Sequence, residues 1–182
     1  MRRFWAFALA VGLPVALLPV GVLADSETHT YALHMEGPNF GVAANGDHIA
    51  IDGMAEFSVN PKSVEGNGTF THTNSGGTVI GAGTWTADEL LNYQSYGCGI
   101  VHFPDGDVIL PPNFCGGAVK MSVTLTTPIG ELPGTMTVIC IIGPNPPNSI
   151  DAKAGEGAML VVPGIVNFNH TDGGDNVIIQ TS

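Results

Sequence analysis

The chain has few cationic side chains. Five Lys and Arg stand against 16 Asp and Glu in 182 residues, and the formal net charge is −11. Two of the five, Arg2 and Arg3, lie at the N-terminus, which leaves Lys62, Lys120 and Lys153 for the rest of the chain. Proteins that bind nucleic acid neutralise phosphates with clustered Lys and Arg, so the composition argues against a nucleic-acid partner. The same shortage argues against adsorption to anionic lipid.

Patterns that hold metal ions or carry covalent catalysis are also missing. The six histidines and three cysteines form no HxH, HExxH or CxxC spacing, so we predict no metal site. The chain has no GxSxG motif, and no arginine follows Arg3. The aspartates in "PDGD" and "HTDGGDN" lie beside glycines, which is typical of turns. We therefore expect neither a metal nor another cofactor.

The first residues have the pattern of a secretory signal peptide. A basic start is followed by a long apolar run and by "VLA" ahead of Asp25, which predicts cleavage after Ala24. The alternative is an uncleaved membrane anchor, because the run from Phe4 to Leu23 is about long enough to span a bilayer. Two prolines within the run would kink such a helix. We therefore expect a signal peptide over residues 1–24 and a single domain over residues 25–182. The protein is then secreted, extracellular or periplasmic, with no stable membrane anchor.

The three cysteines predict one disulfide and one free thiol in an exported protein. Cys98 and Cys115 bracket "GIVHFPDGDVILPPNF", whose "PDGD" centre predicts a tight turn that brings the two ends together. We therefore predict a Cys98–Cys115 disulfide, which would stabilise the fold by about 3 kcal/mol. Cys140 lies in the apolar "MTVICIIG", and we expect a buried, unreactive thiol there.

Alternation with a period of two residues dominates the chain, and helix signals are nearly absent. In "HIAIDGMAEFSV" one predicted strand face carries the apolar side chains and glycine, namely Ile49, Ile51, Gly53, Ala55, Phe57 and Val59. The other face carries His48, Asp52, Glu56 and Ser58. The segment "AVKMSVTLTT" repeats the pattern, with Val119, Met121, Val123 and Leu125 on its apolar face. Both segments are typical of half-buried strands.

These strands define the expected fold class. The one helical hint is "TADELLNYQ", where Thr86 and Glu89 suit a capping box over about one turn. Pro163, inside another strand pattern, indicates an edge or a bulge. We predict an all-β fold of about eight to ten short strands in a single antiparallel β-barrel, with a β-sandwich as the alternative.

The stretch "GNGTFTHTNSGGTVIGAGTW" has one face of threonines and one face of glycines that ends in large aromatic residues. Repeated glycines on one face allow a sheet to coil, or allow something to approach its backbone closely. One interpretation is therefore that the glycines curve the sheet while Phe70 and Trp85 fill the core. The other is that a ligand lies over the glycines, with Phe70, Trp85, Gly81 and Gly83 as the candidate ligand-binding residues.

This stretch, with "LPPNFCGG" further on, resembles a group of small secreted β-rich proteins that have no assigned activity. The resemblance covers most of the chain after the signal peptide and implies a small exported β domain. A weaker resemblance, at the level of the fold, is to the allene oxide cyclase and dirigent type of eight-stranded barrel, which also has Gly-rich and Thr-rich strands. A likeness of that kind implies an architecture and supplies no activity.

The sequence leaves the function open between several hypotheses. The first is a secreted, non-catalytic module that binds a small ligand or an extracellular protein. The second is a small barrel enzyme, an isomerase or lyase, for which Glu56, His72 and His102 are the catalytic candidates because each lies in or beside an apolar strand. The third is a structural surface protein that assembles through strand edges. Asn67 and Asn169 begin glycosylation sequons that matter only in a eukaryotic host.

Overall fold

The computed structural model describes residues 28–147 and 155–182. The predicted signal peptide, residues 1–24, lies outside these ranges. Within them the chain is all β, as predicted, and it contains no helix that could cross a membrane. The described strands are β1 (Thr30–Met35), β2 (Asn39–Ala43), β3 (His48–Val59), β4 (Lys62–Thr73), β5 (Val79–Cys98), β6 (Ile100–Phe103), β7 (Gly106–Ile109), β8 (Phe114–Thr127), β9 (Gly130–Cys140), β10 (Gly157–Val162), β11 (Val166–Thr171) and β12 (Asn176–Gln180).

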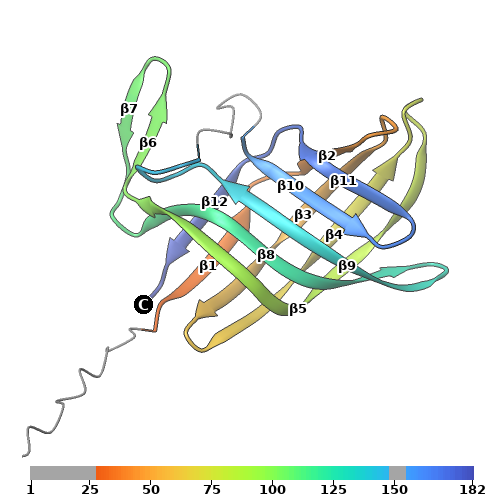
Figure 1. The fold of residues 1–182 in the computed structure, drawn as a ribbon, viewed down its shortest axis with the longest axis horizontal. Helices are drawn as coiled ribbons and strands as arrows, with labels where there is room; N and C mark the ends of the chain where they lie inside the picture. Colours follow the sequence, from red (N-terminus) through yellow and green to blue (C-terminus); the bar gives the residue numbers. More distant parts are fainter. Residues whose placement is uncertain (1–27, 148–154) are drawn as a thin grey trace, which may run out of the picture.

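Ten of the strands form one large antiparallel sheet in the order β1-β12-β8-β5-β4-β3-β2-β11-β10-β9. Two further pairings, β8 with β9 and β1 with β3, join strands that are distant in this order. Pairing from strand to strand therefore closes a ring of eight, β2-β3-β4-β5-β8-β9-β10-β11, and a smaller ring of six that includes β1 and β12. In Figure 1 the strands wrap around a common interior, and the β6–β7 hairpin projects from the upper left.

Strand β3 belongs to both rings because its two halves have different partners. Its first half, from His48 to Ile51, pairs with β2, and its second half, from Met54 to Ser58, pairs with β1. The change of partner falls at Asp52 and Gly53. The sheet therefore divides at this point, and the two rings share the continuous surface of β3, β4, β5 and β8.

The predicted strand faces are confirmed at most positions. In β3 the apolar side chains of Ile49, Ile51, Ala55 and Phe57 are buried, and in β8 Val119, Met121, Val123 and Leu125 are buried. Val59, expected on the apolar face of β3, is only half-buried. Ser58, expected on the exposed face, is buried, and its hydroxyl donates a hydrogen bond to the Pro61 carbonyl at the adjoining turn.

One prediction about secondary structure is wrong. The segment "TADELLNYQ" is strand, because it lies within β5, whose 20 residues pair with both β4 and β8. The register of β5 against β8 shifts at three places, between Ala87 and Glu89, between Leu90 and Asn92, and between Ser95 and Gly97. Such bulges bend and twist a strand and interrupt the alternation of its side chains. The segment therefore lacks the period-two pattern that predicts a strand. The main sheet has ten described strands, within the eight to ten expected, and β6 and β7 form a separate hairpin.

The remaining predictions concern Pro163 and the cysteines. Pro163, expected at an edge or a bulge, lies in the tight turn between β10 and β11, where a proline removes no ladder hydrogen bond. The segment between the first two cysteines folds into the β6–β7 hairpin, and the predicted Cys98–Cys115 disulfide is present at its base. Cys140 is a free, buried thiol, as expected.

Glycines opposite the aromatic residues explain the middle of the core. Trp85 is 1% exposed, and its indole lies over Gly53 and Gly68 on the neighbouring strands. A Cβ atom at either glycine would come within 2.6 Å of the indole. The Trp85 Nε1 donates a 3.0 Å hydrogen bond to the Asp52 carbonyl, which satisfies the buried polar group. The Gly-rich face therefore makes room for a core side chain at this level of the sheet.

Candidate functional site

An apolar pocket of about 360 Å³ lies at one end of the eight-stranded ring. Its inner wall consists of core side chains that have almost no exposure, namely Ile49, Phe70, Leu125, Leu160 and Phe168. These residues come from β3, β4, β8, β10 and β11, so strands from around the ring contribute to one cavity. A largely apolar concave site of this volume is typical of small-ligand pockets.

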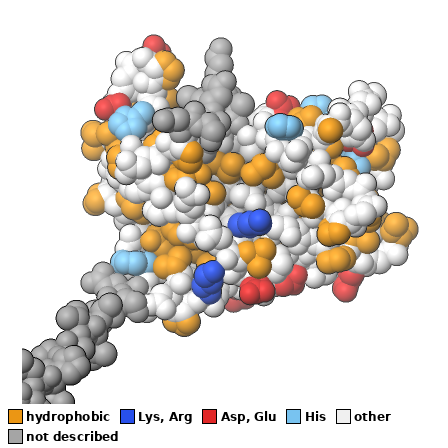
Figure 2. Space-filling view, viewed as in Figure 1, with side chains coloured by type: hydrophobic (Ala, Val, Ile, Leu, Met, Phe, Trp, Pro, Cys, Tyr) orange, Lys and Arg blue, Asp and Glu red, His pale blue; other side chains and the backbone are white. Residues whose placement is uncertain are grey.

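Isoleucines at the strand ends surround the mouth of this pocket. Ile80 at the start of β5 is 56% exposed, Ile129 in the β8–β9 turn is 93% exposed, and Ile165 in the β10–β11 turn is 61% exposed. These turns lie together at the right of Figure 1, and Figure 2 shows hydrophobic side chains at that end. The Lys side chains visible on this face lie nearer the middle of the molecule. The exposed isoleucines continue the buried apolar wall out to the surface, which makes this end of the ring a candidate contact surface.

One titratable side chain, His72, lines the pocket. Its Nε2 lies 3.1 Å from Oδ2 of Asp47, which is in the turn between β2 and β3. The His72 ring also stands edge-on against Phe168, with the ring centroids 5.0 Å apart and the planes at 90°. The two contacts come from different parts of the fold, the turn before β3 and strand β11, and together they restrain the position and the tilt of the imidazole.

Asp47 joins two turns at this end of the ring. Its Oδ2 interacts with His72, and its Oδ1 accepts a 3.1 Å hydrogen bond from the Ser75 backbone N–H in the turn between β4 and β5. The hydrogen bond with His72 is the largest influence on the carboxyl group and lowers its pKa below the usual value, with a further contribution from the Ser75 N–H. Asp47 is therefore ionised near neutral pH and acts as an acceptor, so it is His72 Nε2 that carries the proton.

The four residues expected to bind a ligand separate into two pairs. Phe70 and Gly81 line the pocket. Gly83 lies one step deeper, opposite Phe70, where an added Cβ would meet the Phe70 ring at 3.0 Å. Trp85 is deeper still and pairs with Leu125. The inner half of the glycine-and-aromatic face is packed core and its outer half borders a cavity, while a ligand over the glycines stays a prediction.

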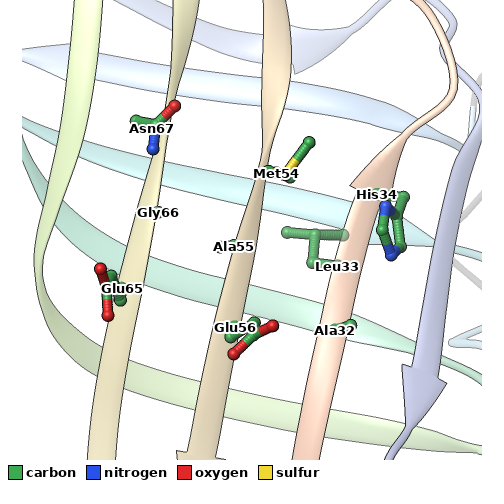
Figure 3. Close-up of a pocket in the computed structure, with 9 residues that line it drawn as sticks. All are labelled: Ala32, Leu33, His34, Met54, Ala55, Glu56, Glu65, Gly66 and Asn67. Atoms are coloured by element: carbon green, nitrogen blue, oxygen red, sulfur yellow. The ribbon is translucent and has the colours of Figure 1, made fainter.

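Glu56 lies on the outer surface, away from the pocket. It is exposed on β3, directly opposite Glu65 of β4, in a shallow hollow of about 290 Å³ that His34 also borders. Figure 3 shows the two glutamates on neighbouring strands, with His34 further off on β1. Among the described residues, no group of three or more His, Cys, Asp and Glu side chains could hold a metal ion. Glu56 therefore does not share a site with His72.

His102 is also remote from the pocket. It lies on the projecting hairpin, where its Nδ1 is 2.7 Å from Oδ1 of the cross-strand neighbour Asp107. Both side chains are about half exposed. A solvated pair of this kind stabilises a hairpin only slightly, and no described cavity places a substrate between the two groups.

The opposite end of the ring holds a buried polar cluster. Asn176, 1% exposed, donates hydrogen bonds of 2.6 Å to Asn39 Oδ1 and 2.9 Å to the Ile139 carbonyl. The two carboxylate oxygens of Glu156 accept from the backbone N–H groups of Ile141 (2.9 Å) and Asn176 (3.2 Å). Burial raises the pKa of the Glu156 carboxyl group. The cluster satisfies backbone groups where strands begin and end, which is a structural role.

The free thiol beside this cluster is not a nucleophile. The Cys140 Sγ donates to the Asn176 carbonyl at 3.0 Å. Burial, with a smaller contribution from the nearby Glu156 carboxylate, raises its pKa to about 12. Cysteine reacts as the thiolate, so the thiol is inert at neutral pH.

Asp47 is the site residue that the sequence analysis missed. The available signal was the hairpin between β3 and β4. Because β3 and β4 pair outward from the turn that joins them, His48 lies opposite Thr73. Asp47, which precedes His48, therefore lies beside the turn between β4 and β5, which contains Ser75. That inference needs the register of two strands, which alternation alone does not supply.

Comparisons with known proteins add no relative to this geometry. No protein-family model matches the chain, and no curated protein or solved structure matches it. The resemblances described above, to small secreted β-rich proteins and to dirigent-type barrels, therefore stay predictions.

Proposed function

We propose that this chain is a secreted, non-catalytic protein that binds a small apolar ligand in the pocket between Phe70, Leu132 and Phe168. The observation that carries the proposal is the cavity itself, which is walled by buried core side chains and opens between exposed isoleucines. An apolar ligand entering it would remove both its own surface and the isoleucine surface from water, at about 25 cal/mol per Å² of apolar area.

The proposal includes the β-barrel form of the fold. The eight-strand ring is supported as a barrel by its complete cycle of antiparallel pairings. Its interior is filled in the middle by Trp85, Met121 and Met136, which are at most 1% exposed, so a ligand has access from one end. Small barrels of this strand number have interiors that side chains fill or that hold one small ligand.

Secretion rests on the N-terminal pattern together with the disulfide. The bond between Cys98 and Cys115 forms and persists in oxidising compartments, such as the extracellular space and the bacterial periplasm. The acidic composition, with a formal net charge of −11, favours solubility there. N-terminal sequencing of the mature protein tests this part directly, and a first residue of Asp25 is expected.

Ligand binding is tested by titration with N-phenylnaphthylamine, a neutral probe that fluoresces in apolar surroundings. The blocking variant is Gly81→Leu. An added Cβ at Gly81 meets only the His72 Cβ, at 3.6 Å, so the new side chain enters the pocket without backbone strain. The matched control is Thr84→Leu, which is exposed on the outer face of the same strand.

We expect the wild type and Thr84→Leu to bind the probe alike and Gly81→Leu to bind it about tenfold more weakly or worse. Thermal unfolding of both variants checks that the fold is intact. Equal binding by all three proteins would show that the probe lies elsewhere and would contradict the proposal.

The contact between His72 and Asp47 supports a second candidate function, a small isomerase or lyase. A histidine held by a carboxylate beside an apolar cavity can act as a general base. The two candidates differ in the fate of the ligand. Chromatography of a bound ligand after long incubation should return it unchanged if the protein is a binder. Conversion that disappears in Asp47→Asn would favour the enzyme.

A further inference from the structure

Two polar side chains, His72 and Thr127, line the otherwise apolar pocket. The Thr127 hydroxyl is already hydrogen-bonded to the Gly130 carbonyl and the Ile129 N–H of its own turn, which leaves His72 as the polar contact for a ligand. His72 lines the cavity, and its side chain is 18% exposed. The ring contacts both the Asp47 carboxylate and the Phe168 ring, so its orientation is restrained before any ligand arrives. A polar group held in place beside an apolar cavity is the usual means by which a binding site selects one end of a ligand.

The two ring nitrogens of His72 have different roles. Nε2 donates its proton to the Asp47 carboxylate, because an ionised carboxylate only accepts hydrogen bonds. In the neutral imidazole, Nδ1 then holds a lone pair and is an acceptor. Among the described residues no hydrogen bond involves His72 Nδ1, so this nitrogen is available to a ligand. The complementary ligand atom is therefore a hydrogen-bond donor.

The charge of the surroundings decides between the donors. His72 is the one titratable side chain among the residues that line the pocket, and no Lys or Arg accompanies it. A carboxylate ligand would meet no Lys or Arg in the lining and would approach the negative Asp47. An ammonium ligand would bury its charge among isoleucines and phenylalanines without a carboxylate in the lining. Burying an unpaired charge is far more costly than burying a neutral hydroxyl group that makes a hydrogen bond.

We infer that the ligand is a neutral apolar molecule with a hydroxyl group, of the class of long-chain alcohols, whose O–H donates a hydrogen bond to Nδ1 of His72. This inference rests on the proposed function, since it names the ligand class of the same pocket. Asp47 is then a positioning residue, because it fixes the tautomer of His72 and lies outside the lining.

The test is displacement of bound N-phenylnaphthylamine by ligands that share one alkyl chain. Decanol can donate a hydrogen bond, decyl methyl ether can only accept one, and decanoate and decylamine are charged. We expect decanol to bind the wild type about fivefold to tenfold more tightly than the ether, the value of one hydrogen bond. The charged ligands should bind more weakly than decanol.

A pair of variants tests whether His72 causes the preference for decanol over the ether. His72→Phe keeps a ring of similar size but removes the acceptor, so decanol and the ether should bind it equally. His102→Phe, on the distant hairpin, should keep the wild-type preference. The ratio of alcohol to ether is measured within each protein, so a general loss of stability does not change it. The wild-type ratio also needs no variant to fold.

The possible outcomes distinguish the ligand-class inference from the proposed function. If the probe binds and Gly81→Leu blocks it, but decanol and the ether compete equally in the wild type, the ligand-class inference is wrong and the proposed function stands. Tighter binding of decanoate or decylamine than of decanol overturns the inference in the same way. If the probe itself does not bind the wild type, both are wrong.

Discussion

The two ends of the eight-stranded ring are closed in different ways. At one end Asn176 and Glu156 hydrogen-bond to backbone groups of β9 and its neighbours, and the Cys98–Cys115 disulfide ties the base of the β6–β7 hairpin. At the other end isoleucines are exposed around a cavity of about 360 Å³. The first end uses polar side chains to satisfy strand ends, whereas the second leaves apolar surface uncovered. Apolar surface exposed to water costs stability. Its presence at one end of the ring is expected if a ligand covers that surface.

The layer between the two ends should carry the largest part of the stability. Trp85 is buried over Gly53 and Gly68 and does not line the pocket. Trp85→Ala is expected to lower the free energy of unfolding by about 3 to 5 kcal/mol, because glycine neighbours cannot fill the cavity. Urea unfolding measures the loss. Thr86→Ala, the next residue on the exposed face, is the control and should change stability by less than about 0.5 kcal/mol. A loss below about 1 kcal/mol for Trp85→Ala would mean that the core at this level is loosely packed.

The disulfide at the closed end should give the next largest effect. The double variant Cys98→Ala with Cys115→Ala is expected to lose about 3 kcal/mol, because the unfolded chain regains the entropy of an open loop. Probe binding by the folded variant should stay unchanged, since no disulfide atom lines the pocket. A folded variant that no longer binds the probe would show that the two ends are coupled.

Acid should act on the two ends in opposite directions. Asp47 has a lowered pKa, so its contribution to stability is present above its ordinary value of 3.8 and is lost as the pH falls through the lower folded-state value. Glu156 has a raised pKa, so the folded state holds its proton longer, and stability falls as the pH rises from its ordinary value of 4.5 through the folded-state value.

Unfolding free energies measured from about pH 3 to pH 7 check both signs. Relative to the wild type, Asp47→Asn should remove part of the gain in stability seen on leaving strong acid. Glu156→Gln should remove a decline at higher pH. Parallel curves for the wild type and both variants would contradict the environments described for these carboxylates.

The smallest effects on stability are expected from substitutions of two exposed isoleucines, one at each end of the ring. Ile129 is 93% exposed at the pocket mouth, and Ile109 is 76% exposed on the hairpin at the other end. Ile129→Ser and Ile109→Ser should each change stability by less than about 0.5 kcal/mol. Ile129→Ser should nevertheless weaken probe binding by about threefold, because it removes apolar contact at the mouth. Equal effects of the two substitutions on binding would argue that the mouth has no special role.

Local chemistry in the sequence predicted much of the fold. The alternation in β3 and β8 identified the buried face, because each strand has one side in the core and one in solvent. The "PDGD" turn predicted the partner of Cys98 because a hairpin brings its own ends together. Both inferences involve residues that are close in the chain.

Features that depend on long-range pairing could not be predicted in this way. The bulges of β5 interrupt the period-two alternation of its side chains, so the spacing of Thr86 and Glu89 predicted a helix cap instead of a strand. The contact between Asp47 and His72 joins residues 25 positions apart and depends on the register of β3 against β4. The pocket itself exists because seven strands contribute to its lining, which no single segment indicates. Of the candidates chosen from the sequence, Phe70, Gly81 and His72 lie at this pocket, and Glu56 and His102 lie elsewhere.

A crystal structure of the protein soaked with decanol gives the most direct measurement. We expect electron density for one alkyl chain between Phe70 and Phe168, with the hydroxyl oxygen within hydrogen-bond distance of His72 Nδ1. A pocket that stays empty while the alcohol occupies the β6–β7 hairpin or the outer hollow beside Glu56 would contradict the proposed binding site.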